Sequence, residues 1–453
     1  MTELYPADRH EPLSAPPWDA GAARSEIEMI VTDARASVDD RGLWATHPKD
    51  RDDGSLRLTD LYFGAGGAIW TLQHLAGAGA AADGPSLAHH LAPMRQQTHA
   101  YHEALGVQTR AYLTGDAGLL LAEWRLAPSP AIADALAEVI AANTHDPAQE
   151  LMWGAPGTLL AALHMHRATG EARWVDLFRA GAQALEATFV RVPDFPTLIW
   201  TQDLYGAQRQ HFGLVHGFAG NAFVLIQGRE LLPAKSWTRW SPRLAETLAA
   251  SATHGDDGIN WTAGVGPTRP GRIAPVQACH GAPGMILGLA DLDQPIDGLL
   301  LGGGELIWRA GPLRKGAGFC HGTAGNGYAF LKLFERTGDQ IWLERARAFA
   351  MHAIAEPGGP GDLWPTALFA LDRRPGPGGV PLGLPQREGP FPNPACLVST
   401  TRTVREGAWR AVRRPVPLPA PSLRSRSRRD RGSALARLVA ANGPPLRASS
   451  TVA

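Results

Sequence analysis

Two Cys-His pairs, each directly followed by glycine, are the residues in this sequence that could hold a metal. They are Cys279 with His280 and Cys320 with His321. Thiolate is a soft ligand that favours zinc over magnesium or calcium. Two cysteines and one histidine are a known set of catalytic zinc ligands, with the fourth position left open for water or substrate. The residue types therefore predict a zinc centre, provided that the fold brings the two pairs together.

The pairs leave alternatives to a catalytic site. If both His280 and His321 bound the metal, the site would be closed and structural. Without a metal, the thiols would be two unconnected buried cysteines. Ligands 41 residues apart do not match the spacing of a standard zinc finger. A third cysteine, Cys396, lies in a C-terminal region of different composition, and we do not count it as a ligand.

The elements that must position these pairs form an internal repeat. Six segments share the pattern Gly-x-x-Gly followed by an apolar run of helical period, and amphipathic stretches lie between them. Their first glycines are Gly64, Gly115, Gly154, Gly217, Gly281 and Gly322. Glycine permits a tight turn and close approach of backbones at a helix start. The repeat predicts helical hairpins, each with an inner helix that begins at the glycines and an outer amphipathic helix.

The expected fold is all-α, a closed α/α toroid of six to seven hairpin repeats. An open array of repeats needs polar capping units, and no polar cap is obvious at Leu61, where the first unit begins. Equivalent positions on adjacent units of a ring lie side by side. This arrangement would bring both thiols and up to two imidazoles together at one face of the ring.

Composition limits the classes of function. The chain has 453 residues, with 43 basic and 43 acidic side chains, and from residue 401 onward we count 12 arginines against two acidic residues. The remainder is therefore acidic, which argues against nucleic acid as a partner of the folded body. Neither a signal peptide nor an apolar run long enough for a membrane span is evident. Three cysteines do not make a disulfide framework. We expect a cytoplasmic monomer.

The sequence around both Cys-His pairs resembles the lanthionine synthetase C-like (LanC-like) family. The similar segments are CHGAPG at 279–284 and RKGAGFCHGTAGNGYAFLKL at 314–333, with further blocks between about 61 and 371. The resemblance implies a toroid of seven inner and seven outer helices, and zinc held by Cys279, Cys320 and His321. His280 stands where lanthipeptide cyclases usually have tyrosine. The histidine form resembles the stand-alone branch, which includes glutathione-binding members.

The resemblance also implies a reaction and roles for further residues. The expected activity is zinc-dependent addition of a thiol, from glutathione or a peptide cysteine, to dehydroalanine or dehydrobutyrine in a peptide. His216 would protonate the α-carbon, and His280 would assist or shape the pocket. Glu150 is a candidate for the acidic partner seen in cyclases, although a solvated carboxylate at a helix start is an equal alternative. Lys315 matches a lysine that contacts glutathione in the stand-alone branch of the family. The alternative is that Lys315 is an ordinary surface residue.

Two other functions remain open at this stage. The chain could be a lanthipeptide cyclase with a dedicated precursor peptide, in which case the thiol belongs to the acceptor peptide itself. No fused dehydratase region appears in the sequence, so we expect the chain to be a separate protein. The chain could also be a non-catalytic, zinc-stabilised scaffold that binds a peptide or glutathione.

The expected domains are a lead-in at 1–56, the toroid at 57–372 and an Arg/Pro-rich, disordered tail at 373–453. A seventh Gly-x-x-Gly helix is expected near 362–382, but that region is rich in Pro, which cannot continue a helix interior. Permissible codons for Arg373 to Pro394, read one base out of frame, can restore such a unit, which places a frameshift between about Trp364 and Arg374. We therefore hypothesise that a frameshift replaces the seventh repeat with the tail.

Overall fold

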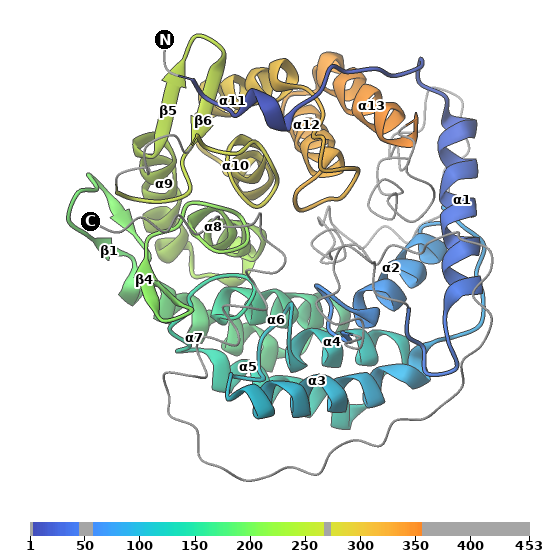
Figure 1. The fold of residues 1–453 in the computed structure, drawn as a ribbon. Coiled ribbons are helices and arrows are strands. Elements are labelled where there is room, and N and C mark those ends of the chain that lie inside the picture. The colour runs from blue at the N-terminus through green and yellow to red at the C-terminus, as the bar shows by residue number, and fades with distance from the viewer. Residues whose placement is uncertain (1–2, 45–57, 267–272, 356–453) are drawn as a thin grey trace, which may run out of the picture.

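Thirteen α-helices alternate between an inner and an outer ring in the computed structural model, which describes residues 3–44, 58–266 and 273–355. The inner helices are α2 (Ala65–Gly77), α4 (Asp116–Leu126), α6 (Ala155–Thr169), α8 (Phe218–Gln227), α10 (Ala282–Leu289) and α12 (Thr323–Thr337). The outer helices are α1 (Ala20–Ser37), α3 (Leu91–Leu105), α5 (Pro130–Asn143), α7 (Ala172–Thr188), α9 (Ala234–Ala250), α11 (Asp297–Ala310) and α13 (Gln340–Ala355). This double ring (Figure 1) confirms the predicted α/α toroid.

The two rings differ in how their helices are buried. Every residue of α8 and α10 is buried, because these inner helices have neighbours on all sides. The outer helix α7 buries Trp174, Phe178 and Leu185 on one face, at helical spacing, and turns its polar residues outward. An apolar stripe on an otherwise polar helix is the pattern of a helix with one face in water. The glycine repeats therefore mark the inner ring.

Packing proceeds around the ring from one inner helix to the next. Contacts join α2 to α4, α4 to α6, α6 to α8, α8 to α10 and α10 to α12. The outer ring also meets itself, since α1 contacts α13. Within the described residues, no comparable packing joins α12 to α2. The predicted seventh unit, the tail at 373–453 and Cys396 lie outside the residues that the structure describes.

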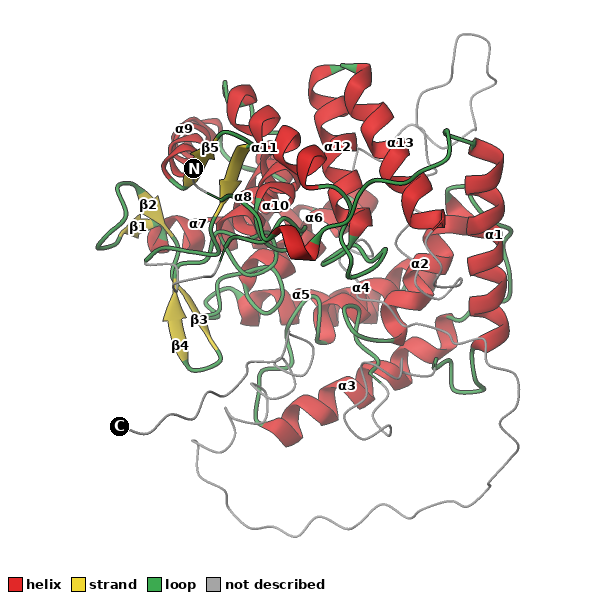
Figure 2. Cartoon of the chain, turned by 45° about the horizontal axis from the view of Figure 1, so that its top comes forward, coloured by secondary structure: helices red, strands yellow, loops and turns green. Residues whose placement is uncertain are grey.

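Three short antiparallel hairpins project from the helical rings (Figure 2). They consist of β1 (Val190–Arg191) with β2 (Leu198–Ile199), β3 (Gln202–Leu204) with β4 (Ala207–Arg209), and β5 (Ala252–Gly255) with β6 (Gly258–Trp261). These strands depart from the all-α expectation, because segments of two to four residues are too short to show an alternating pattern in the sequence. The β3–β4 hairpin bears on the site described below.

The N-terminal residues 3–19, here called the N-terminal strap, run across the ends of α11, α12 and α13 (Figure 1). The strap includes the 3₁₀ helix η1 (Ala7–Arg9), while η3 (Ala88–His90) and η4 (Arg229–Leu231) lie elsewhere. His10 Nδ1 lies 2.9 Å from the carbonyl oxygen of Gly311, and Arg314 Nε donates to the carbonyl of His10 at 2.6 Å. The strap therefore holds the loop that leads into α12. No helix in the described ranges is both long and apolar enough to cross a membrane.

Candidate metal centre

A similar turn precedes the inner helices α2, α4, α8 and α12, in which the first amide of the helix donates to the carbonyl seven residues earlier. The amide of Phe218 donates to the carbonyl of His211 at 2.9 Å, and the amide of Thr323 donates to the carbonyl of Gly316 at 3.0 Å. Gly281 adopts φ +90°, a conformation that favours glycine. Residues two positions before the first glycine therefore share one place in every unit. They are Tyr62, Leu113, Met152, Val215, Cys279 and Cys320.

Backbone hydrogen bonds join these turns to one another. The Leu151 amide donates to the Val215 carbonyl at 3.1 Å, and the Cys279 amide donates to the Cys320 carbonyl at 3.3 Å. Further around the ring, the Tyr62 amide donates to Leu113 at 2.9 Å. The two cysteines therefore become neighbours because they hold equivalent positions on adjacent units, as the repeat predicts.

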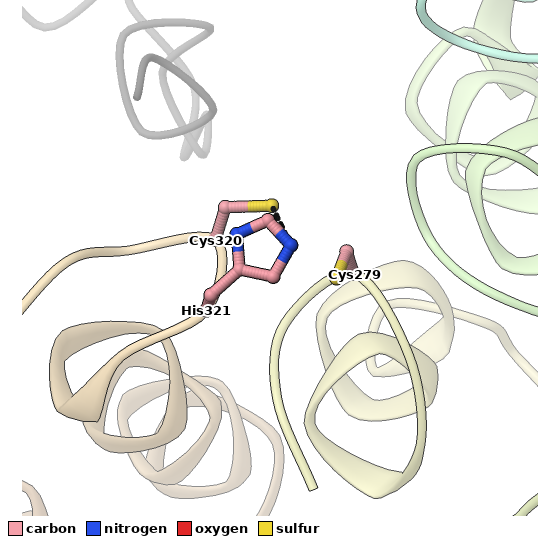
Figure 3. A group of neighbouring side chains, drawn as sticks. All are labelled: Cys279, Cys320 and His321. Carbon is pink, nitrogen blue, oxygen red and sulfur yellow. Dashed lines mark hydrogen bonds between the residues drawn. The ribbon is translucent and has the colours of Figure 1, made fainter. Parts of the chain in front are cut away.

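Cys279, Cys320 and His321 form a cluster with the chemistry of a metal site (Figure 3). One ligand atom from each residue lies within 4.8 Å of the others, and Cys320 Sγ is 3.9 Å from His321 Nε2. Both thiols are buried, while the imidazole is partly exposed. This donor set fits zinc, and three protein ligands would leave one coordination position for a substrate. His280 is not part of the cluster, so the described geometry does not assemble the closed four-ligand alternative.

The two thiols are electrostatically coupled. Burial raises the pKa of Cys279, and the hydrogen bond that it donates to Cys320 acts in the same direction. That hydrogen bond, together with His321, lowers the pKa of Cys320. The pair is therefore arranged to hold one proton, with the negative charge on Cys320. A metal that bound here would displace this proton, as expected for thiolate ligands.

Each sulfur also accepts a hydrogen bond from a buried neutral side chain. Tyr62 donates its hydroxyl to Cys320 Sγ at 3.1 Å, and Gln277 Nε2 donates to Cys279 Sγ at 2.9 Å. Neither donor was predicted from the sequence. For Tyr62 a signal was present, since it holds the position in the first unit that Cys320 holds in the sixth. For Gln277 the only signal in the sequence is that it lies two residues before Cys279.

His216, which is partly exposed, and the buried Glu150 form a pair from adjacent units. His216 Nδ1 lies 2.7 Å from Glu150 Oε2, and the carboxylate is 0% exposed. Glu150 also accepts hydrogen bonds from the backbone amides of Met152 and Trp153, at 3.1 and 2.6 Å. The alternative of a solvated carboxylate is therefore wrong for Glu150. The turn before α6 buries this side chain against the next unit, which the sequence did not reveal.

The charge of Glu150 determines the protonation of His216. Burial by itself would lower the pKa of His216, but the hydrogen bond to Glu150 and its negative charge outweigh burial and raise the pKa. Cys320 contributes in the same direction, so the imidazole lies within electrostatic range of the metal cluster. Both neighbours therefore favour the protonated form of the imidazole.

His280 and Lys315 occupy different surroundings from this pair. Burial, followed by the neighbouring His216 and His211, lowers the pKa of His280 to about 3. Its ring is therefore neutral, and within the described residues its buried Nδ1 has no partner. Lys315 is exposed. Burial raises the pKa of Cys279, and the positive charge of Lys315 acts in the opposite direction and lowers it. The ammonium group therefore lies on the side of the metal cluster.

The fold and the site agree with a comparison to protein families. Residues 55–356 match the family model described as lanthionine synthetase C-like protein. The chain belongs to the lanthionine synthetase C-like family. The match spans all six Gly-x-x-Gly units and both Cys-His pairs, and it confirms the resemblance seen in the sequence.

Curated relatives of this LanC-like chain include two eukaryotic proteins. The chain is 33% identical over 150 residues to glutathione S-transferase LANCL1 of Danio rerio, covering 32% of this chain and 35% of that protein. It is 29% identical over 217 residues to LanC-like protein GCL1 of Arabidopsis thaliana, covering 45% of this chain and 46% of that protein. The chain thus matches between about a third and a half of the length of these relatives.

Among solved structures, nisin cyclase has a similar fold. Its TM-score is 0.51 at 14% sequence identity, and the alignment covers 78% of this chain and 94% of that chain. At this identity the likeness concerns the fold of the LanC-like chain, and it places the helices of the toroid in a common arrangement.

Proposed function

We propose that this LanC-like protein uses zinc to add a thiol to dehydroalanine or dehydrobutyrine residues in a peptide, which forms a thioether. The observation that carries the proposal is the convergence of two features on one face of the ring. These are the Cys279, Cys320 and His321 cluster and the His216–Glu150 pair, whose imidazole interacts electrostatically with Cys320. One feature suits activation of a thiol and the other suits proton transfer.

Zinc held by these three ligands would lower the pKa of a thiol substrate, so that its thiolate persists at neutral pH. Protein residues would do the remaining work. The thiolate adds to the β-carbon, and electrons of the carbon–carbon double bond move toward the adjacent carbonyl. His216 in its protonated form delivers a proton to the α-carbon, and the proton lost by the thiol restores it. Glu150 orients His216 and stabilises its positive charge.

The thiol donor that we propose is glutathione. A relative that matches part of the chain is named a glutathione S-transferase, and Lys315 offers an exposed positive charge near Cys279 that could contact a substrate carboxylate. His280, held neutral by burial, would shape the pocket beside the thiol rather than transfer a proton. A peptide cysteine remains the competing donor, and it would make the protein a cyclase.

The test is a reaction of the zinc-loaded full chain with glutathione and a dehydroalanine peptide, followed by mass spectrometry. We expect a peptide–glutathione adduct that is lost when zinc is chelated and in Cys320→Ala and His216→Asn. A matched control is His254→Asn, since His254 is an exposed residue of β5. Ring closure of a cysteine-containing acceptor without glutathione would instead support a cyclase. Peptide binding without any zinc-dependent adduct would favour a scaffold and reject the proposal.

A further inference from the structure

The turn of the β3–β4 hairpin contains an unusual tyrosine. Leu204 pairs with Ala207, and the two residues between them, Tyr205 and Gly206, have φ of +55° and +79°. Hairpin turns with two positive φ values favour Asn-Gly or Gly-Gly, because bulky side chains are strained in this conformation. A strained residue of this kind persists where its surroundings hold it, and such positions cluster at functional sites.

Strain is concentrated next to the His216–Glu150 pair. Only three non-glycine residues have positive φ within the described parts of the chain, and they are Gln149, Asp194 and Tyr205. Gln149 directly precedes Glu150, and the ring of Tyr205 meets the ring of His216 edge-on, with centroids 6.4 Å apart and an interplanar angle of 79°. Two of the three strained residues therefore border the proposed acid–base pair.

The hydroxyl of Tyr205 is held in place as an acceptor. Trp153 Nε1 donates to Tyr205 Oη at 3.1 Å, while the backbone amide of Trp153 donates to Glu150. One residue thus fixes both the phenol and the carboxylate. Since an indole N–H can only donate, the phenolic proton of Tyr205 is left for another acceptor. The described side chains offer it none, and the phenol is only partly buried.

The surroundings also keep this phenol protonated. Burial and the nearby charge of Glu150 raise the pKa of Tyr205, although the hydrogen bond from Trp153 acts in the opposite direction. The result is a fixed, neutral hydrogen-bond donor beside a histidine whose pKa is raised. Such a donor can stabilise negative charge that develops on a substrate oxygen.

We propose that Tyr205 is a further catalytic residue, which donates its hydroxyl hydrogen to the carbonyl oxygen of the dehydroamino acid. The inference rests on the proposed function. As the bond from sulfur to the β-carbon forms, the π electrons of the double bond shift toward this oxygen. The hydrogen bond from Tyr205 stabilises the resulting enolate, without transfer of the phenolic proton. His216 then protonates the α-carbon, and the carbonyl is restored.

The first variant to test is Tyr205→Phe, which keeps the ring against His216 and removes the hydroxyl. We expect kcat for glutathione addition to fall by about 10²- to 10³-fold, the usual effect of losing one oxyanion donor, with little change in KM. Zinc content and the midpoint of thermal unfolding should stay at the wild-type values. A kcat within about threefold of wild type would overturn the assignment.

A second variant separates chemistry from strain. Tyr205→Asn places the residue that this turn prefers, so we expect greater stability together with the same loss of kcat. Asp194→Gly is the matched control, because it relieves positive φ in a loop between β1 and β2 and should leave kcat unchanged. If Tyr205→Asn were as active as wild type, the tyrosine would be dispensable and the proposal would fail.

A third measurement probes the donor itself. Fluorotyrosines at position 205 keep the shape of the ring and lower the pKa of the phenol. We expect kcat at pH 7 to change in step with phenol acidity, whereas a purely structural role predicts no dependence. An adduct formed by the wild type but insensitive to every change at Tyr205 would reject this inference alone. No adduct with any zinc-loaded variant, wild type included, would reject the proposed function instead.

Discussion

The carboxylate of Glu150 is fully buried, so water does not solvate its charge, and it pairs with the imidazole of His216. This arrangement ties the protonation of the histidine to one hydrogen bond of 2.7 Å. Two backbone amides hold the carboxylate in place, so its orientation does not depend on the imidazole. In the proposed reaction, the acid strength of His216 could therefore be changed by altering Glu150 alone.

The first prediction concerns the pH dependence of Glu150→Gln. In the proposed reaction His216 acts as an acid, so we expect activity below its pKa and loss of activity as the pH rises through that value. Glu150 raises this pKa in the wild type. The amide should therefore move the alkaline limb of kcat/KM to lower pH and reduce kcat by about 10²-fold.

A full pH profile of kcat/KM, measured for both proteins, checks this prediction. Glu138→Gln, at an exposed position of α5, is the control and should keep the wild-type profile. An unchanged alkaline limb in Glu150→Gln would show that His216 is not the titrating group.

The second prediction concerns Tyr62→Phe. The hydroxyl of Tyr62 donates to Cys320 Sγ, and loss of such a partner of a metal ligand typically weakens metal affinity by about 10- to 100-fold. We expect this weakening of zinc affinity when the variant competes with a chelator for zinc. When cobalt replaces zinc, the sulfur-to-metal charge-transfer band should shift to lower energy. Unaltered affinity and spectrum would mean that the sulfur does not need this donor.

At the scale of elements, the turn before each inner helix sets the site. The turn before α12 leaves no room for a side chain at Gly325, since a β-carbon there would collide with the carbonyl oxygen of Phe319. Gly298, in the exposed first turn of α11, has open space around it. Both are helical glycines, so a comparison of the two isolates the effect of close packing.

The third prediction follows from this pair of glycines. Gly298→Ala should stabilise the protein by about 0.4–1 kcal/mol, because alanine restricts the unfolded chain. Gly325→Ala should destabilise it, since the turn that carries Cys320 has to shift. Urea unfolding of both variants measures the difference, and zinc affinity should fall only in Gly325→Ala. Equal effects of the two substitutions would contradict the packing argument.

These turns also explain what the sequence could predict. The glycine spacing defined the inner helices and placed Cys279 beside Cys320, because equivalent positions of a repeat become spatial neighbours. Burial of Glu150 was not visible, since it depends on contact with the following unit. Tyr205 was missed because its strands are three residues long and its turn lacks the usual Asn-Gly. Residues whose role arises from contacts between units carry little local signal.

At the scale of the molecule, the ring has one junction unlike the others. Inner helices pack in succession from α2 to α12, yet no comparable packing joins α12 to α2 within the described residues. The apolar residues of α1 and α2 belong to a smaller cluster that also contains Leu119 and Ala122 of α4 and Ala353 of α13, beside the large cluster that spans α4 to α13. Tyr62 and Cys320 nevertheless meet across this junction.

The fourth prediction concerns the reading frame after about Trp364. If a frameshift replaced the seventh unit, a gene with the frame restored should encode a chain with a higher midpoint of thermal unfolding, because a seventh inner helix would cover apolar faces. Resequencing of the locus and melting of both chains check this. An uninterrupted frame in several isolates, or equal midpoints, would contradict the hypothesis.

The N-terminal strap has a consequence for how the chain folds during synthesis. Leu4 accepts a hydrogen bond from Asn260, and Ser14 bonds with His352, more than three hundred residues later. Translation adds roughly 5–20 residues per second, so the strap, once made, has no partner for on the order of tens of seconds. The strap must dock after α13 has emerged from the ribosome. Its attachment is therefore a late, non-local step, which secures the beginning of the chain to its last described helix.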